Sequence, residues 1–244
     1  MKPFLLLGTR ADDHVADNEY EAFLGFTGLD EAHLRRHRLE ATPLERLDLD
    51  DWSGIFMGGG PFNSSDPAAS KSPTQQRVEA DLDRLLSAIV AADFPLLGAC
   101  YGIGTLGTHQ GAVVDRTYGE PIGRVPVTVS DAGAADPLFS AVPRIFEAFV
   151  GHKEAVRELP GHATLLASSP SCPVQAFRIG RNVYATQFHP ELDVPGLCLR
   201  IETYRHAGYF APHEMETVLA IARSGTVHHP PRLLQRFVEL HARS

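Results

Sequence analysis

The chain of 244 residues lacks the features that mark membrane and secreted proteins. No apolar run approaches the ~20 residues that a membrane-spanning helix requires. The short apolar stretch at the N-terminus meets charged residues at once, which favours a first strand over a secretion signal. The three cysteines are an odd set without framework spacing. We therefore expect free thiols in the cytoplasm, a reducing compartment.

Common ligand-binding motifs are also missing. The sequence has no Gly-x-x-x-x-Gly-Lys-Ser/Thr loop and no dinucleotide fingerprint. Its twelve histidines show no ligand spacing for zinc, so we expect no metal and no cofactor. Positive charge is in deficit, because the formal net charge is −8. This charge disfavours nucleic acid and anionic membranes as partners.

Short apolar runs alternate with helical patterns along the chain. Buried strands are predicted at Phe4–Leu7, Gly54–Met57, Pro95–Ala99, Val125–Val129 and Val183–Phe188. A helix is predicted over Pro73–Ala92, with Ser72 as its cap. This alternation predicts an α/β fold, with a mainly parallel open sheet and helices on both faces. Sites in such sheets lie at the carboxyl ends of the strands.

Two segments fall outside this pattern. Residues 9–27 are polar and acidic, and we expect them to form a long excursion over the surface. The residues after Leu192 show two or three amphipathic helical patterns, at Leu197–Ala207, Pro212–Arg223 and Pro231–Ala242. We expect residues 1–192 to form the main domain and residues 193–244 a helical C-terminal extension packed on it. A partner-docking or lid role for this extension is the alternative.

Cys100 follows an apolar run and is flanked by small residues, in Gly98-Ala-Cys-Tyr-Gly102. The pattern predicts a strand that delivers one side chain onto a sharp turn before a helix, as in a nucleophile elbow. A cysteine at a helix N-terminus is favoured as thiolate. A buried core cysteine is the structural alternative.

A possible base lies 89 residues downstream, in the β-rich run that ends at His189-Pro-Glu191. Residues two apart in an extended chain face the same side, so His189 and Glu191 can point at one site. A cysteine nucleophile needs a base, and the base needs a third group that fixes its tautomer. Cys100, His189 and Glu191 together supply these three roles.

These segments resemble the class I, or triad, glutamine amidotransferases, and especially the glutaminase domain of GMP synthase. The resemblance runs from about Phe4 to Leu192 through five ordered matches. The matching segments are Gly54–Pro61, Gly98–Gly102, Phe149–Val156, which is similar to His-x-Asp-x-Val, Ala167–Pro173 and Gln187–Glu191. The resemblance implies a flavodoxin-like class I glutaminase fold without the ATP-binding domain of a complete synthase.

It also implies a hydrolase in which Cys100 attacks the γ-carbonyl of glutamine and forms a thioester. The N–H groups of Gly60 and Tyr101 would form the oxyanion hole. Gly59, Gly104 and His152 stand at implied substrate-binding positions, although His152 could equally be a buried hydrogen-bonded histidine. The implied partners are a small molecule, glutamine or a γ-glutamyl amide, and a separate synthase subunit that accepts the ammonia.

Gly104 departs from the family pattern, which has glutamine four residues after the nucleophile to help bind the substrate. This departure favours a γ-glutamyl peptidase or hydrolase that acts on a larger amide. If the side chain fits, Gly104→Gln should improve glutamine hydrolysis. A non-catalytic regulatory protein on the same fold is a third interpretation, against which the complete set of Cys100, His189 and Glu191 argues.

Overall fold

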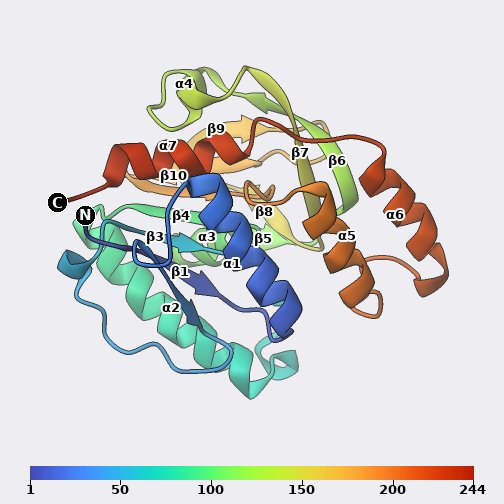
Figure 1. The fold of residues 1–244 in the computed structure, drawn as a ribbon, viewed down its shortest axis with the longest axis horizontal. Helices are drawn as coiled ribbons and strands as arrows, with labels where there is room; N and C mark the ends of the chain where they lie inside the picture. The colour runs from blue at the N-terminus through green and yellow to red at the C-terminus, as the bar shows by residue number, and fades with distance from the viewer.

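A nine-stranded sheet forms the centre of the protein in a computed structural model, which describes residues 1–244 (Figure 1). Its strands are β1 (Phe4–Gly8), β2 (Leu34–Arg38), β3 (Gly54–Met57), β4 (Leu96–Ala99), β6 (Glu120–Val129), β7 (Ile145–His152), β9 (Thr164–Ser168), β10 (Ala176–Ile179) and β11 (Val183–Thr186). Their order is β2-β1-β3-β4-β11-β10-β9-β6-β7. The short strands β5 (Val113–Asp115) and β8 (Ala155–Glu158) form a separate antiparallel pair.

The sheet has a parallel and an antiparallel half. Strands β2, β1, β3, β4 and β11 run parallel to their neighbours. Strands β10, β9, β6 and β7 continue the sheet in antiparallel pairs. The α/β fold and the parallel strands β1, β3, β4 and β11 agree with the sequence prediction, which had missed β2. That edge strand reads Leu-Arg-Arg-His-Arg and has no apolar alternation, because one of its sides has no neighbouring strand.

Helices cover both faces of the sheet. They are α1 (Asp13–Thr27), α2 (Pro73–Ala92), α3 (Tyr101–His109), α4 (Asp131–Ala134), α5 (Val194–Thr203), α6 (Met215–Arg223) and α7 (Pro231–His241). In β3, Ile55 and Met57 pack in one core with residues of α2 and α3, whereas Phe56 packs in a second core with residues of α1 and α7. This alternation follows from the two-residue period of a strand. No helix is long and apolar enough to cross a membrane.

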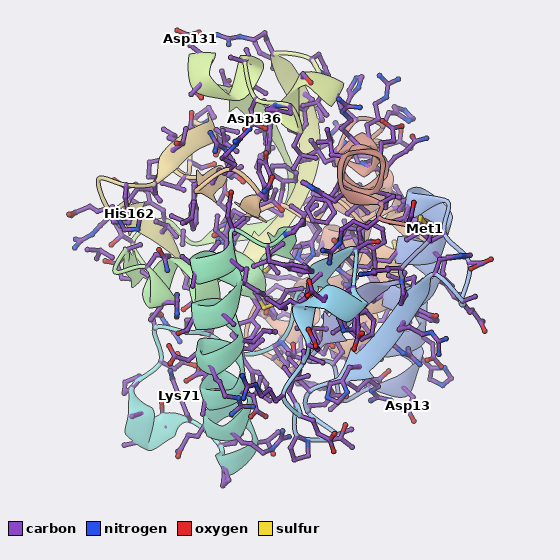
Figure 2. The ribbon with its side chains drawn as sticks, turned by 90° about the vertical axis from the view of Figure 1, so that its left-hand side faces the viewer. Met1, Asp13, Lys71, Asp131, Asp136 and His162 are labelled. Carbon is purple, nitrogen blue, oxygen red and sulfur yellow. The ribbon has the colours of Figure 1, made fainter.

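The prediction of a surface excursion over residues 9–27 is wrong, because Asp13–Thr27 forms the helix α1. The Asp12 carboxylate accepts a hydrogen bond from the Val15 N–H at 3.1 Å and caps the helix. Asp13 lies at the periphery of the molecule (Figure 2), and most other acidic residues of α1 are also exposed. Glu19 is the exception at 2 % exposure. The exposed acidic face hid a narrow buried stripe from the sequence analysis.

The residues after Leu192 contain the three helices expected there, and all of them pack on the rest of the chain. The Phe237 ring of α7 lies 5.0 Å from that of Phe56 in β3, between ring centroids. Helices α5 and α6 pack against Phe149 of β7 in a third apolar cluster. The two termini meet, because the Lys2 N–H donates to the Arg243 carbonyl at 2.8 Å (Figure 1).

Candidate active site

Cys100 occupies a sharp turn between β4 and α3. Its φ of 52° and ψ of −96° place a non-glycine residue at positive φ, a conformation that costs free energy and is typical of functional sites. The turn leaves no room for side chains beside it, since a Cβ on Gly98 would lie 3.2 Å from the backbone of Gly102. The Cys100 N–H donates to the Thr186 carbonyl of β11 at 2.8 Å. This is the nucleophile elbow that the glycines predicted.

His189 and Glu191 follow β11, the neighbour of β4. Nδ1 of His189 lies 2.8 Å from Oε1 of Glu191, whose carboxylate is completely buried. His189 also lies next to Cys100, because a Cβ on Gly59 would be 2.7 Å from the His189 Cε1 and 3.4 Å from the Cys100 Cβ. The structure therefore brings together the three residues that the sequence singled out, at the carboxyl ends of β3, β4 and β11.

The surroundings of His189 and Glu191 favour the charged form of both groups. Burial alone would lower the pKa of His189, but the Glu191 carboxylate and the neighbouring Cys100 raise it to about 9. Burial would raise the pKa of Glu191, but His189 and Arg200 hold it well below its usual range. At neutral pH the pair is an imidazolium and a carboxylate.

The sequence analysis missed Arg200, which lies on α5 and supports Glu191. Its Nη1 donates to Oε1 of Glu191 at 2.9 Å, and its Nη2 lies 3.5 Å from Oε1 of Glu19. The residue is 6 % exposed. A signal was present in the sequence, since an arginine beside Leu197 and Ile201 on the apolar stripe of a helix needs a buried partner.

A second buried arginine, Arg10, follows β1 and was also missed. Its Nε donates to Oε1 of Glu19 at 2.8 Å, and its Nη1 donates to the Tyr204 hydroxyl at 3.3 Å. Glu19 therefore joins Arg10 to Arg200, and Arg200 joins Glu19 to Glu191. A continuous buried chain of charges runs from β1 through α1 to the His189 side chain.

A pocket with about 470 Å³ of empty space opens at Cys100. Its walls come from the strand ends and from the residues after Leu192. The lining residues are Arg10, Gly60, Pro61, Cys100, Ile122, Val150, Gly151, His189, Leu192, Leu197, Arg200, Tyr204 and Tyr209. Concave, mainly apolar walls with a few convergent polar groups are typical of sites for small molecules.

Two backbone N–H groups are available at the pocket. The Gly60 N–H makes no hydrogen bond within the protein. The Tyr101 N–H is at the first position of α3, where a helix supplies no partner. Gly60 must be glycine, because a Cβ there would lie 1.9 Å from the Thr9 Oγ1. The backbone can thus approach a ligand closely at this point.

The profile of the family described as "Glutamine amidotransferase class-I" matches residues 30–194, more than half of the chain. The chain belongs to this family. It is 30% identical over 154 residues to the glutamine-hydrolyzing component of the GMP synthase of Thermoplasma acidophilum, covering 62% of this chain and 68% of that one. It is 32% identical over 151 residues to the glutamine-hydrolyzing GMP synthase of Streptomyces avermitilis, covering 62% of this chain but only 26% of that protein.

Solved structures of amidotransferases share the fold. A glutamine amidotransferase from Thermotoga maritima superposes with a TM-score of 0.76 at 20% identity, covering 100% of both chains. A glutamine amido transferase from Methylobacillus flagellatus gives a TM-score of 0.70 at 18% identity, covering 100% of this chain and 97% of that one. The elements after Leu192 are thus part of the architecture that these amidotransferases share with this chain.

Among the positions that the family resemblance had implied for substrate binding, His152 does not reach the pocket. Its Nε2 lies 2.8 Å from Oε2 of Glu120, and its Nδ1 lies 2.8 Å from the Glu154 carbonyl. Both ring nitrogens are therefore occupied inside the protein, and the residue is 5 % exposed. The assignment of His152 to substrate binding is corrected to that of a buried hydrogen-bonded histidine.

Gly104 is also absent from the pocket wall, where the amidotransferase pattern has glutamine. A Cβ on Gly104 would lie 2.7 Å from Oε1 of Glu154 and 3.2 Å from the Ser64 hydroxyl. The Glu154 carboxylate accepts hydrogen bonds from the N–H groups of Ser64 and Ser65, both at 2.7 Å. Glu154 occupies the aspartate position of His-x-Asp-x-Val, and its longer side chain fills the space beside Gly104. A glutamine at position 104 does not fit, and the expected gain from Gly104→Gln is withdrawn.

Gly104→Gln is expected to destabilise the protein by about 1–3 kcal/mol, because overpacking displaces the Glu154 carboxylate from its two N–H donors. Thermal unfolding measures this loss. Gly25→Gln is the matched control, since Gly25 lies in α1 with nothing within 4 Å of an added Cβ. Glu154→Asp in the Gly104→Gln protein should recover part of the loss. Equal melting temperatures for the two single variants would contradict this account of Gly104.

No group of three or more histidine, cysteine, aspartate or glutamate side chains could hold a metal ion. The three cysteines are free, and burial raises the pKa of Cys172 to about 12.

Proposed function

We propose that the protein hydrolyses the γ-amide of glutamine, or of a γ-glutamyl compound, through a thioester on Cys100. The observation that carries the proposal is the strained elbow that presents Cys100 beside the His189–Glu191 pair. Membership in the amidotransferase family supports the same chemistry. The pocket at Cys100 supplies room for a small substrate.

In the proposed reaction the Cys100 sulfur attacks the γ-carbonyl carbon, and the carbonyl oxygen becomes an oxyanion. The N–H groups of Gly60 and Tyr101 stabilise this charge, and one such donor typically contributes ~3–4 kcal/mol to the barrier. The His189 imidazolium protonates the departing ammonia, and the thioester remains on Cys100. His189 then takes a proton from water, which hydrolyses the thioester and releases the acid.

Glu191 and Arg200 act through His189. Glu191 fixes the ring by accepting from Nδ1, which directs Nε2 to the reacting atoms. Arg200 holds the Glu191 carboxylate in place at 2.9 Å and compensates its buried charge. An imidazolium that stays protonated well above neutral pH is suited to protonate ammonia as it leaves.

The fate of the ammonia distinguishes two forms of this function. The similarity to one component of a GMP synthase supports donation of ammonia to a separate synthase subunit. A γ-glutamyl peptidase or hydrolase is the second candidate. It is favoured by Gly104, which leaves the position of the family's substrate-binding glutamine to Glu154.

The discriminating experiment measures product release from glutamine and from a panel of larger γ-glutamyl amides. Robust turnover of glutamine alone, or its appearance only with an added synthase subunit, supports the amidotransferase. Better turnover of a larger amide supports the hydrolase. In each case Cys100→Ser must abolish turnover, whereas Cys198→Ser on α5 must not. Turnover that survives Cys100→Ser would refute the proposed function.

The pH profile tests the state of His189. Because the pKa of His189 is raised to about 9, we expect kcat/KM to fall as the pH rises through about 9, where His189 loses the proton that ammonia needs. The same shift makes the charged ring contribute to folding fully below pH ~6.5, and this contribution is lost as the pH rises through about 9. An alkaline limb near pH 6.5 would contradict the raised pKa.

A further inference from the structure

The Arg10 guanidinium faces the pocket with one nitrogen uncommitted. The side chain is 4% exposed and is held by Glu19 through Nε and by Tyr204 through Nη1. Its Nη2 makes no hydrogen bond within the protein, although Arg10 lines the pocket. A buried cation that is oriented by two partners and keeps a free donor is a ready site for an anion.

This donor lies close to the proposed reacting atoms. The Cβ position of Gly59 is 2.9 Å from the Arg10 Nη2, 2.7 Å from the His189 Cε1 and 3.4 Å from the Cys100 Cβ. Arg10, His189 and Cys100 therefore border the same small space. In a γ-glutamyl group the α-carboxylate is four bonds from the carbonyl carbon that Cys100 would attack, and this span suits the separation of the two protein groups.

The charges around the pocket change as the reaction proceeds. Before acylation, Cys100 can balance the protonated His189 ring. Once Cys100 is acylated, it no longer carries charge. The two arginines of the buried chain are then matched by the carboxylates of Glu19 and Glu191, and protonated His189 is in excess. A carboxylate on the bound acyl group would compensate this charge in a site largely closed to water.

We propose that Arg10 binds the carboxylate of the substrate, so that the acyl substrates are γ-amides that carry a free carboxylate on the acyl chain. This inference rests on the proposed function of Cys100. Glu19 and Tyr204 are then positioning residues, which hold the guanidinium at the right height above the nucleophile. Arg10 lies N-terminal to residues 30–194 that match the family profile.

Three compounds separate the contributions of the substrate's charged groups. Glutamine carries both the carboxylate and the ammonium, glutaramic acid lacks the ammonium, and 4-aminobutanamide lacks the carboxylate. The measurement is the concentration of each that half-protects Cys100 from alkylation by iodoacetamide, which reports binding with or without turnover. Arg10→Gln, Arg10→Lys and the charge-balanced pair Arg10→Gln with Glu19→Gln are compared with the exposed control Arg205→Gln.

We expect the wild-type protein to bind glutamine and glutaramic acid roughly 10- to 100-fold more tightly than 4-aminobutanamide, as charge-assisted hydrogen bonds allow. Arg10→Gln, alone or with Glu19→Gln, should remove this preference and leave 4-aminobutanamide unchanged. Arg10→Lys should retain part of it, and Arg205→Gln all of it.

Equal weakening of all three compounds in the Arg10 variants would overturn the proposal, as would a wild-type protein without preference for the carboxylate. Neither result affects the proposed function, which fails separately if Cys100 is not alkylated or if turnover survives Cys100→Ser. The paired variant keeps the buried charges balanced, so a folding defect of Arg10→Gln alone does not leave the question open.

Discussion

Replacement of Cys100 with alanine is expected to lower kcat for γ-amide hydrolysis by ~10⁴-fold or more. The thioester cannot form without the sulfur, and the remaining oxyanion donors and the pocket provide only a small residual acceleration. Alanine leaves the fold intact, since Cys100 is held at the elbow by its backbone N–H on the Thr186 carbonyl. Initial rates and thermal unfolding of the two proteins measure the separate effects.

Alkylation supplies the matched control for this variant. Brief iodoacetamide treatment followed by mass spectrometry should modify Cys100 first. Cys172 should stay unmodified, because it is completely buried and burial raises its pKa to about 12. Cys198→Ser should keep full activity. Fast labelling at Cys172 or Cys198, or an active Cys100→Ala protein, would remove Cys100 from the mechanism.

Glu191→Gln is expected to lower kcat by about 10³- to 10⁴-fold while the protein stays folded. The amide keeps the shape of the carboxylate but cannot stabilise the imidazolium, and it can present its NH₂ group to His189 and favour the wrong tautomer. Because the Glu191 charge raises the pKa of His189, the alkaline limb of the pH profile should move from about 9 to a lower pH. Steady-state kinetics between pH 6 and 10 measure both effects.

Glu202→Gln is the control for this substitution, since Glu202 is exposed on the same helix as Arg200. It should change neither the rate nor the limb. A Glu191→Gln protein with reduced kcat but an unmoved alkaline limb would show that Glu191 does not set the protonation of His189. Unchanged kcat would exclude it from the catalytic arrangement altogether.

The residues that the sequence could reveal are those whose chemistry is written locally. Gly98, Gly102 and the apolar run before Cys100 describe one tight turn, and the spacing of His189 and Glu191 follows from the two-residue period of an extended chain. Parallel strands then bring these segments to one edge of the sheet, because the carboxyl ends of neighbouring strands meet there. Local pattern and sheet topology together were sufficient for this part of the site.

The buried charges around these residues could not be predicted in the same way. Glu19 is one acid among many in α1, and only its contacts with Arg10 and Arg200, far apart along the chain, distinguish it. All three lie outside residues 30–194, which match the family profile. For Gly104, the sequence showed a missing glutamine, whereas the cause is a side chain fifty residues away. Pairings over such distances depend on tertiary packing.

The acylated enzyme is the species that tests the central proposal most directly. Turnover of the best γ-amide substrate is stopped with acid within milliseconds to seconds, and the intact protein and its peptides are weighed by mass spectrometry. We expect the mass of a γ-glutamyl group on the peptide that contains Cys100, its absence from Cys100→Ala, and its loss on incubation at neutral pH as water hydrolyses the thioester. Turnover with no acyl group on Cys100 at any time, or an acyl group on another residue, would contradict the account.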